Sequence, residues 1–195
     1  MNTKLKNIDR REALKRTALI MGSAVSVPVM TGLLQGCVAS NEPTWTPVYM
    51  DEQQASVVTS LTDTILPTTD TPGAVDVGVP QFIDRMLMDV YEQEWQTKFN
   101  EGLVEFNTRV EETYGKSFEK LDQEQKNEIV LMFHEEALNK DGGYESNFVM
   151  SIKELTVAAY CTSEAGATMV LKYDKIPGEY KGCIDFSEVG KTWAT

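Results

Sequence analysis

The chain has 195 residues, of which 42% are hydrophobic and 9% aromatic, and it carries a formal net charge of −12. This amount of apolar sequence supplies the core of one domain and excludes a disordered chain. The acidic balance excludes nucleic acid and an anionic membrane surface as partners of the folded part, because both carry charge of the same sign.

Residues 1–36 differ in charge from the rest of the chain. They hold six Lys/Arg and two Asp/Glu, so the 12 basic and 28 acidic residues that remain leave a net charge of −16. The pair Arg10-Arg11 precedes an apolar stretch interrupted by small residues, a pattern typical of a twin-arginine export signal, although Asp9 and Ala13 depart from it. We expect a signal peptide over residues 1–36. The alternative is a chance Arg pair before an ordinary helix or an uncleaved anchor.

A lipid-attachment sequence closes this stretch. Residues 34–37 read Leu-Gln-Gly-Cys and resemble a lipobox, in which the cysteine is diacylated and becomes the new N-terminus. Acyl chains add membrane affinity of about 0.8 kcal/mol per buried CH₂ group. We expect Cys37 to be the lipid anchor, and the alternative is simple cleavage near Ala39. Residues 37–50 contain two prolines and few periodic apolar positions, so they predict a tether.

The body of the chain begins with two predicted helices. A capping-box pattern at Asp51 starts the first helix, whose apolar residues recur at helical spacing until Pro67 ends it. The segment 67–79 contains Pro and Gly and predicts a loop, after which Pro80 opens the second helix. We expect its apolar face to comprise Phe82, Ile83, Met86, Leu87 and Val90.

Further helices are predicted in the second half of the chain. Apolar residues keep helical spacing over 95–110, where Gly102 weakens the helix locally. A second capping-box pattern at Asp122 opens a run through Phe133, and a helix over about 145–160 follows a Gly-Gly turn. Sustained alternation with a period of two residues is absent from the sequence. The body therefore predicts an all-α fold, a compact bundle of about five or six helices with long loops, as one domain over residues 51–195.

Sequence motifs of catalysis and cofactor binding are absent. The chain has no G-x-S-x-G, G-x-G-x-x-G, G-x-x-x-x-G-K or H-E-x-x-H pattern. His134 is the only histidine and lies in a predicted helix, where a structural role is more common than a catalytic one. Asp63, Asp70 and Asp76 lie in or beside the Pro/Gly loop, and capping of helix ends is favoured over cation binding. We expect no catalytic, cofactor-binding or metal site in this chain.

Three cysteines are an awkward number for an exported protein. If Cys37 carries lipid, Cys161 and Cys183 remain, and a pair outside the cytoplasm tends to oxidise to a disulfide. A metal site is the other use of two cysteines, but the sequence has no C-x-x-C and no histidine near either residue. The chain-entropy relation assigns about 3 kcal/mol to closing a loop of this size.

The segment 160–183 is rich in polar residues and in glycine. Ser163 is placed to cap a short helix that runs through Leu171, Glu164 lies in its first turn near the positive end of the dipole, and Gly166 allows close approach. Neither cysteine has a general base near it in the sequence. We therefore interpret the segment as a disulfide-clasped helix and loop that contacts a protein partner. The candidate partner interface comprises Glu164, Tyr173, Pro177 and Tyr180.

Two stretches resemble the gluconate 2-dehydrogenase subunit 3 family, the small subunit of a membrane-bound dehydrogenase. They are LTDTILPTTDTPGAVDVGVPQFIDRML at residues 61–87 and LTVAAYCTSEAGATMVLKYDKIPGEYKGC at residues 155–183, in the order that the family shows. Residues 88–154 match only in length and helical pattern, and Ala158-Ala159 stand where a Gly is more usual before the Tyr. The resemblance implies a non-catalytic subunit. Its partners would be a large FAD-dependent subunit of the glucose-methanol-choline type and a cytochrome c subunit that takes the electrons.

The resemblance also agrees with the export signal. The twin-arginine pathway moves folded proteins, so one leader on the small subunit would export a folded, FAD-loaded large subunit that lacks its own. We expect a periplasmic, membrane-associated accessory subunit that aids export, maturation and stability of the flavoprotein. Two alternatives stay open: a free-standing periplasmic lipoprotein that binds a ligand or an envelope protein, and an independent oxidoreductase, which the lack of cofactor motifs disfavours.

Overall fold

The computed structural model of the chain describes residues 45–139, 147–176, 178–179 and 181–194. The expected leader with Arg10 and Arg11, and the expected anchor Cys37, lie outside these residues. The described part is all-α, as predicted, and its single β-bridge is the isolated parallel pair Lys172–Trp193. Its elements are α2 (Glu52–Ile65), α3 (Val79–Asp89), α4 (Gln93–Tyr114), the 3₁₀ helix η1 (Phe118–Lys120), α5 (Gln123–Asn139), α6 (Phe148–Thr162), the π-helix η2 (Gly166–Val170) and α7 (Phe186–Val189).

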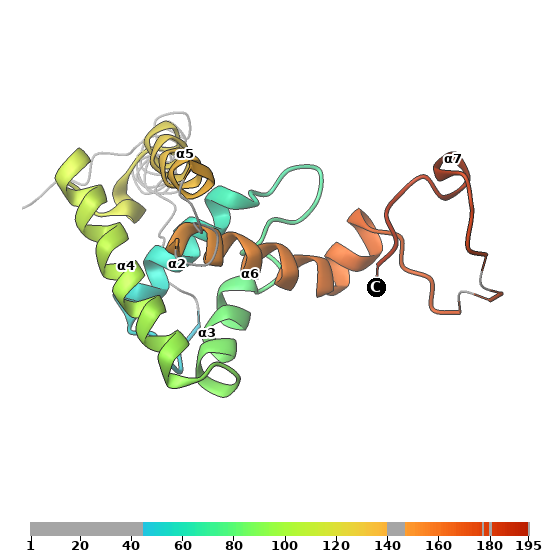
Figure 1. Cartoon of the computed structure of the whole chain (residues 1–195), viewed down its shortest axis with the longest axis horizontal. Helices are drawn as coiled ribbons and strands as arrows, with labels where there is room; N and C mark the ends of the chain where they lie inside the picture. Colours follow the sequence, from blue (N-terminus) through green and yellow to red (C-terminus); the bar gives the residue numbers. More distant parts are fainter. Residues whose placement is uncertain (1–44, 140–146, 177, 180, 195) are drawn as a thin grey trace, which may run out of the picture. The chain divides into compact units, whose positions relative to one another are not determined.

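Helix α6 is the common partner of the other long helices. It contacts α2, α3, α4 and α5, and Figure 1 shows it running between them. Its inward positions are buried: Phe148, Ile152, Leu155 and Ala159. Because each long helix turns its apolar stripe toward α6, the described residues bury one shared core.

The predicted helix starts are confirmed by their hydrogen bonds. Asp51 accepts from the backbone N–H of Gln54 at 2.8 Å, and Gln54 accepts from the N–H of Asp51 at 3.1 Å. Asp122 accepts from the backbone N–H of Gln125 at 2.9 Å in the same arrangement. Helix α6 begins three residues later than predicted, because Asn147 caps it by accepting from the third residue of the helix at 3.3 Å.

The apolar face predicted for α3 is only partly right. Ile83 and Leu87 are fully buried, whereas Phe82 and Val90 are exposed to 41% and 62%. The buried stripe instead includes Asp84, which lies next to Ile83 on the same face and is 1% exposed. An ionised carboxylate in this position needs hydrogen-bond donors to compensate for the loss of water.

The carboxylate of Asp84 finds these donors in the segment before α2. It accepts from the backbone N–H groups of Val48 at 2.7 Å, Tyr49 at 3.1 Å and Met50 at 2.8 Å. Met50 is 5% exposed and belongs to the core, and Tyr49 packs against that core. We placed residues 45–50 in the tether, but the C-terminal end of this segment, residues 48–50, is packed onto the helices.

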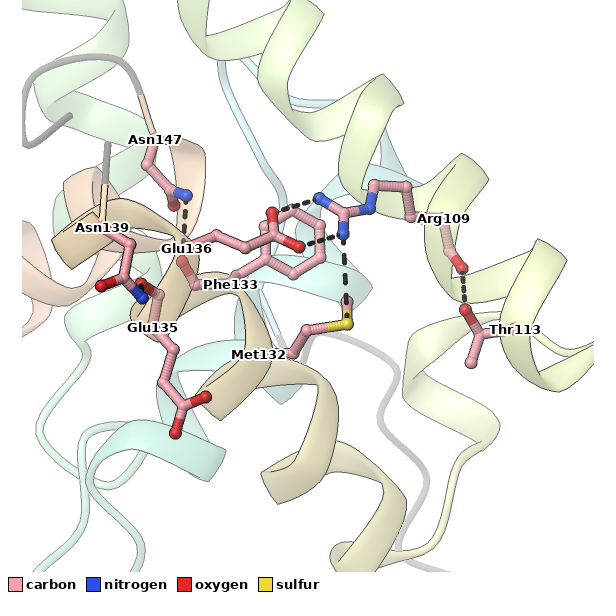
Figure 2. Close-up of polar contacts among 8 residues, drawn as sticks. All are labelled: Arg109, Thr113, Met132, Phe133, Glu135, Glu136, Asn139 and Asn147. Atoms are coloured by element: carbon pink, nitrogen blue, oxygen red, sulfur yellow. Dashed lines mark hydrogen bonds and ion pairs between the residues drawn. The ribbon is translucent and has the colours of Figure 1, made fainter. Parts of the chain in front are cut away.

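Helices α4 and α5 are joined by an ion pair (Figure 2). The guanidinium of Arg109 donates to both carboxylate oxygens of Glu136, at 2.8 and 2.6 Å, and lies 4.3 Å from the ring centroid of Phe133. The hydrogen bonds to Glu136 raise the pKa of Arg109. Two-pronged pairs of this kind fix geometry as well as adding energy, so they set how α4 lies against α5.

Gly102 does not interrupt α4, although the sequence suggested a local weakness there. A Cβ atom at this position would lie 2.8 Å from the Cβ of Phe148 at the start of α6. The ring of Phe148 in turn packs against Phe99 and Phe106, with centroids 5.4 and 5.7 Å away. The glycine therefore lets α4 approach α6 closely enough to build this aromatic cluster.

Candidate functional site

The two stretches that carry the family resemblance lie against each other in the fold. Helix α6, whose second half from residue 155 belongs to the second stretch, contacts both α2 and α3, which flank the loop of the first stretch. The hydroxyl of Tyr160 donates to the backbone oxygen of Pro72 at 2.7 Å, across 88 positions of sequence. Tyr160 is 7% exposed, so this bond lies at the edge of the core. Residues of the two stretches thus make contacts that hold the two stretches together in the fold.

The loop between α2 and α3 is held by its own polar groups. The backbone N–H of Ala74 donates to the oxygen of Leu66 at 2.8 Å. The carboxylate of Asp76 accepts from the Thr68 hydroxyl at 2.6 Å and from the Gly73 N–H at 2.8 Å. These two bonds favour the charged form and lower the pKa of Asp76. Asp76 therefore holds the loop from within, and it does not cap the end of α2 or the start of α3 as we expected.

Asp63 near the end of α2 and Lys126 on α5 influence each other electrostatically. Burial raises the pKa of Asp63, the nearby Lys126 opposes that rise, and Asp76 adds to it. Burial lowers the pKa of Lys126, which is 9% exposed and has its ammonium 5.7 Å from the ring centroid of Phe118. Within the described ranges, no group of three or more His, Cys, Asp or Glu could hold a metal ion.

His134 contacts a thioether rather than a nucleophile. Its Nδ1 atom lies 3.1 Å from the sulfur of Met150, which joins α5 to α6. Sulfur contacts of this kind are packing contacts of a polarisable atom and do not activate a hydroxyl or thiol. The arrangement favours the structural role that we expected for this histidine.

The turn after α6 has the expected cap. The hydroxyl of Ser163 accepts from the backbone N–H of Gly166 at 3.1 Å and donates to the oxygen of Tyr160 at 2.7 Å. A Cβ at Gly166 would overlap the carbonyl of Tyr160, so only glycine fits where the chain passes so close to α6. Glu164 is exposed on this turn, and the segment continues as the π-helix η2, which ends at Val170.

The C-terminal arm, defined here as residues 169–194, closes back on its own start. The backbone of Lys172 pairs with the end of the arm: its N–H donates to Thr192 at 2.8 Å, and its oxygen accepts from Ala194 at 2.9 Å. The ammonium of Lys172 lies 4.5 Å from the ring centroid of Trp193. These contacts turn the arm into a closed loop, drawn in red in Figure 1.

The arm exposes much of its apolar surface. Seven of the sixteen large apolar side chains that are exposed in the described residues lie on it. Tyr173, a predicted interface residue, is 56% exposed, Ile176 is 79% exposed and Phe186 is 67% exposed. Pro177 and Tyr180, the other interface residues predicted here, lie outside the described residues. The seven exposed side chains are Met169, Val170, Tyr173, Ile176, Ile184, Phe186 and Trp193.

The two cysteines of the folded body are free thiols in the structure. Cys161 lies half-buried near the end of α6, and Cys183 is exposed on the arm. The contacts that close the arm are those of Lys172 with its end, not a bond between these sulfurs. The disulfide between Cys161 and Cys183 stays a prediction.

Sequence reasoning missed the closure at Lys172 and the exposed Ile176, Ile184 and Phe186. One signal was present, because residues 169–194 carry four Lys and four Asp/Glu in a chain that is otherwise acidic after its leader. Isolated apolar residues without helical spacing in such a neutral segment indicate exposed side chains rather than a core element.

The comparisons with known proteins identify one family. Residues 52–178 match the family described as "Gluconate 2-dehydrogenase subunit 3", which is more than half of the chain. This range contains α2 to α6, both motif stretches up to residue 178 and the first part of the arm. No curated protein and no solved structure matches the chain. None of the helices in the described ranges has both the length and the apolarity needed to cross a membrane.

Proposed function

Because the chain belongs to the gluconate 2-dehydrogenase subunit 3 family, we propose that it is the accessory small subunit of a gluconate or sugar dehydrogenase complex. The family match over residues 52–178 carries this proposal. Two features of the described residues support it. The polar side chains of both motif stretches are used to hold the fold, at Tyr160 and Asp76 among others. The arm, in contrast, presents apolar side chains of the kind that protein interfaces use.

The proposed division of labour assigns the redox chemistry to the partners. A large FAD-dependent subunit oxidises the sugar acid or alcohol, and a cytochrome c subunit takes the electrons. This chain holds the large subunit in its mature, folded form. FAD is therefore a cofactor of the complex and is bound by the large subunit.

The proposed route to the periplasm rests on the leader. Arg10 and Arg11 direct a folded assembly to the twin-arginine pathway, and Cys37 attaches the exported complex to a membrane. A large subunit that folds around FAD in the cytoplasm must be exported in its folded state. It can be exported together with a small subunit that carries the twin-arginine signal. This explains why a subunit without redox chemistry of its own carries the export signal.

The experiment is purification of the complex from membranes. A C-terminal tag on the full-length chain is introduced at its own gene, and membranes are solubilised in mild detergent. We expect the eluate to contain a flavoprotein in fixed proportion to the tagged chain, together with flavin fluorescence and gluconate- or sugar-dependent dye reduction. A second strain that lacks this chain should retain the flavoprotein in its cytoplasm.

A chain that elutes alone and without flavin, from a strain with normal dehydrogenase activity, would contradict the proposal. That result would favour a free-standing periplasmic lipoprotein. Replacing Arg10 and Arg11 by Lys gives a second arm of the test, because Lys keeps the charge and removes the guanidinium. Flavoprotein that still reaches the periplasm of this strain would remove the export role from the proposal.

A further inference from the structure

The arm differs from the rest of the described chain in the exposure of its apolar side chains. Each long helix buries an apolar stripe in the shared core, whereas no described residue of the arm is buried. Ile176 and Phe186 are the most exposed large apolar residues of the described chain, at 79% and 67%. Exposed apolar surface of this density marks sites of protein or membrane contact.

The arm nevertheless has a defined conformation, because hydrogen bonds join its two ends. Besides the backbone pairing of Lys172 with Thr192 and Ala194, the Lys191 ammonium donates to the backbone oxygen of Met169 at 2.6 Å. These contacts join the two ends of the arm, while residues 173–176, 178–179 and 181–188 stay exposed. A loop that is closed before it binds loses less conformational freedom on binding, which is what a docking element requires.

Charge decides which class of partner fits the arm. Residues 45–168 carry 23 Asp/Glu and 8 Lys/Arg, a formal charge of −15, whereas residues 169–194 carry four of each and are neutral. An acidic body of this size is repelled from an anionic lipid surface. Aromatic and aliphatic side chains mixed with balanced charges are, in contrast, the composition of a protein interface with an apolar centre and a polar rim.

We propose that the C-terminal arm is the segment by which this chain docks onto the large flavoprotein subunit, with Ile176 and Phe186 as apolar anchors. The contacts of Lys172 with Trp193 and the end of the arm hold these anchors in one closed loop. The proposal rests on the proposed function, since it takes the large subunit to be the partner. It assigns the interface to a segment of which residues 179–194 lie beyond the family match.

The first test removes the anchors from the full-length chain, which is purified separately from its large subunit. Ile176→Ser and Phe186→Ser each replace an exposed apolar side chain, as does the control Leu131→Ser on α5, where the leucine is 57% exposed. Affinity for the purified flavoprotein is measured by titration, with flavin fluorescence as the readout. We expect each arm variant to lose affinity about tenfold or more, and the control to stay within about threefold of wild type.

The second test opens the loop and keeps the anchors. Trp193→Ala removes the ring beneath the Lys172 ammonium while Ile176 and Phe186 remain. We expect faster proteolysis within the arm, an unchanged melting temperature of the helical body and a loss of affinity smaller than that of either anchor variant. Full affinity with an open, protease-sensitive arm would overturn the role of the closure.

The outcomes separate this inference from the function on which it rests. If the wild-type chain retains no flavoprotein, the proposed function fails. If the wild type retains it and the double variant Ile176→Ser/Phe186→Ser does so equally well, the docking proposal is overturned. Binding to vesicles of phosphatidylethanolamine and phosphatidylglycerol is the third measurement. Arm variants that lose binding to these vesicles while keeping the flavoprotein would assign the arm to the membrane and also overturn the proposal.

Discussion

Asp84 offers the sharpest test of how the fold is held together. Its carboxylate is 1% exposed and accepts three backbone N–H groups from residues 48–50. Asp84→Asn keeps the shape of the side chain and removes the charge. The bonds divide unevenly, because Tyr49 and Met50 donate to one carboxylate oxygen and Val48 donates to the other.

The magnitude of the effect follows from this division. An amide oxygen can replace the acceptor of Tyr49 and Met50, but the amide NH₂ then faces the N–H of Val48, so that donor loses its partner. A hydrogen bond to a charged group contributes about 1.5–3 kcal/mol, and bonds to a neutral oxygen are about half as strong. The variant should therefore lose about 2–4 kcal/mol of unfolding free energy. Detachment of residues 45–50 limits the loss, because it gives up the burial of Met50 and the packing of Trp45 and Tyr49 against the core instead.

Urea denaturation followed by far-UV circular dichroism measures this loss. Asp89→Asn is the matched control, because Asp89 lies on the same helix and its side chain is 60% exposed. Its ion pair with Arg85 is long, at 3.9 Å, and therefore weak. We expect that control within about 0.5 kcal/mol of wild type. Amide hydrogen exchange at residues 48–50 reports detachment of the segment alone. Equal midpoints for the two variants, with unchanged protection of these amides, would refute the anchoring role of Asp84.

Further predictions address other contacts of the fold. Gly102→Ala should destabilise the protein by about 1–2 kcal/mol in a thermal melt, because crowding against α6 outweighs the gain in helix propensity, and a stabilised variant would contradict the close approach. Arg109→Ala should lose about 1 kcal/mol of unfolding free energy in urea denaturation, because it breaks the two hydrogen bonds to Glu136, and an unchanged midpoint would contradict the role of this pair. The lowered pKa of Asp76 stabilises the fold above its ordinary value of 3.8, and this contribution is lost as the pH falls through the folded-state value. The stability difference between wild type and Asp76→Asn should therefore be constant above about pH 5 and shrink in acid, and a difference that grows in acid would show the opposite sign. Alkylation and mass mapping of periplasmic protein should find Cys161 bonded to Cys183, and two free thiols in an assembled complex would reject the disulfide.

Local signals in the sequence predicted the helices well. The capping boxes at Asp51 and Asp122 depend on residues three apart, and the loop after α2 depends on Pro and Gly within a few positions. Contacts between residues a few positions apart in the sequence depend on the local backbone conformation and not on the packing of distant segments. The same is true of the Ser163 cap and the close approach at Gly166.

Contacts between distant segments were not predictable in this way. Gly102 looked like a weak point because its partner, Phe148, is 46 positions away and makes the glycine a packing requirement. The sequence analysis did not single out Asp84, although its place beside Ile83 on the inward stripe was a usable signal. Its donors lie 34 to 36 positions earlier, in a segment that sequence reasoning assigned to the tether.

The distribution of the family match along the chain separates the fold from the partner surface. Within residues 52–178, the polar groups of the motif stretches bind one another, as Tyr160 does with Pro72. A sequence pattern made of such contacts describes a fold and says little about which large subunit is bound. The match stops inside the arm, before Phe186 and before Trp193, which helps to close the loop. Phe186 is exposed and not part of the core, so the fold of the helices does not depend on it. If the arm docks as proposed, selectivity among dehydrogenases should follow from the residues of the arm, and exchange of residues 169–194 between family members would test this.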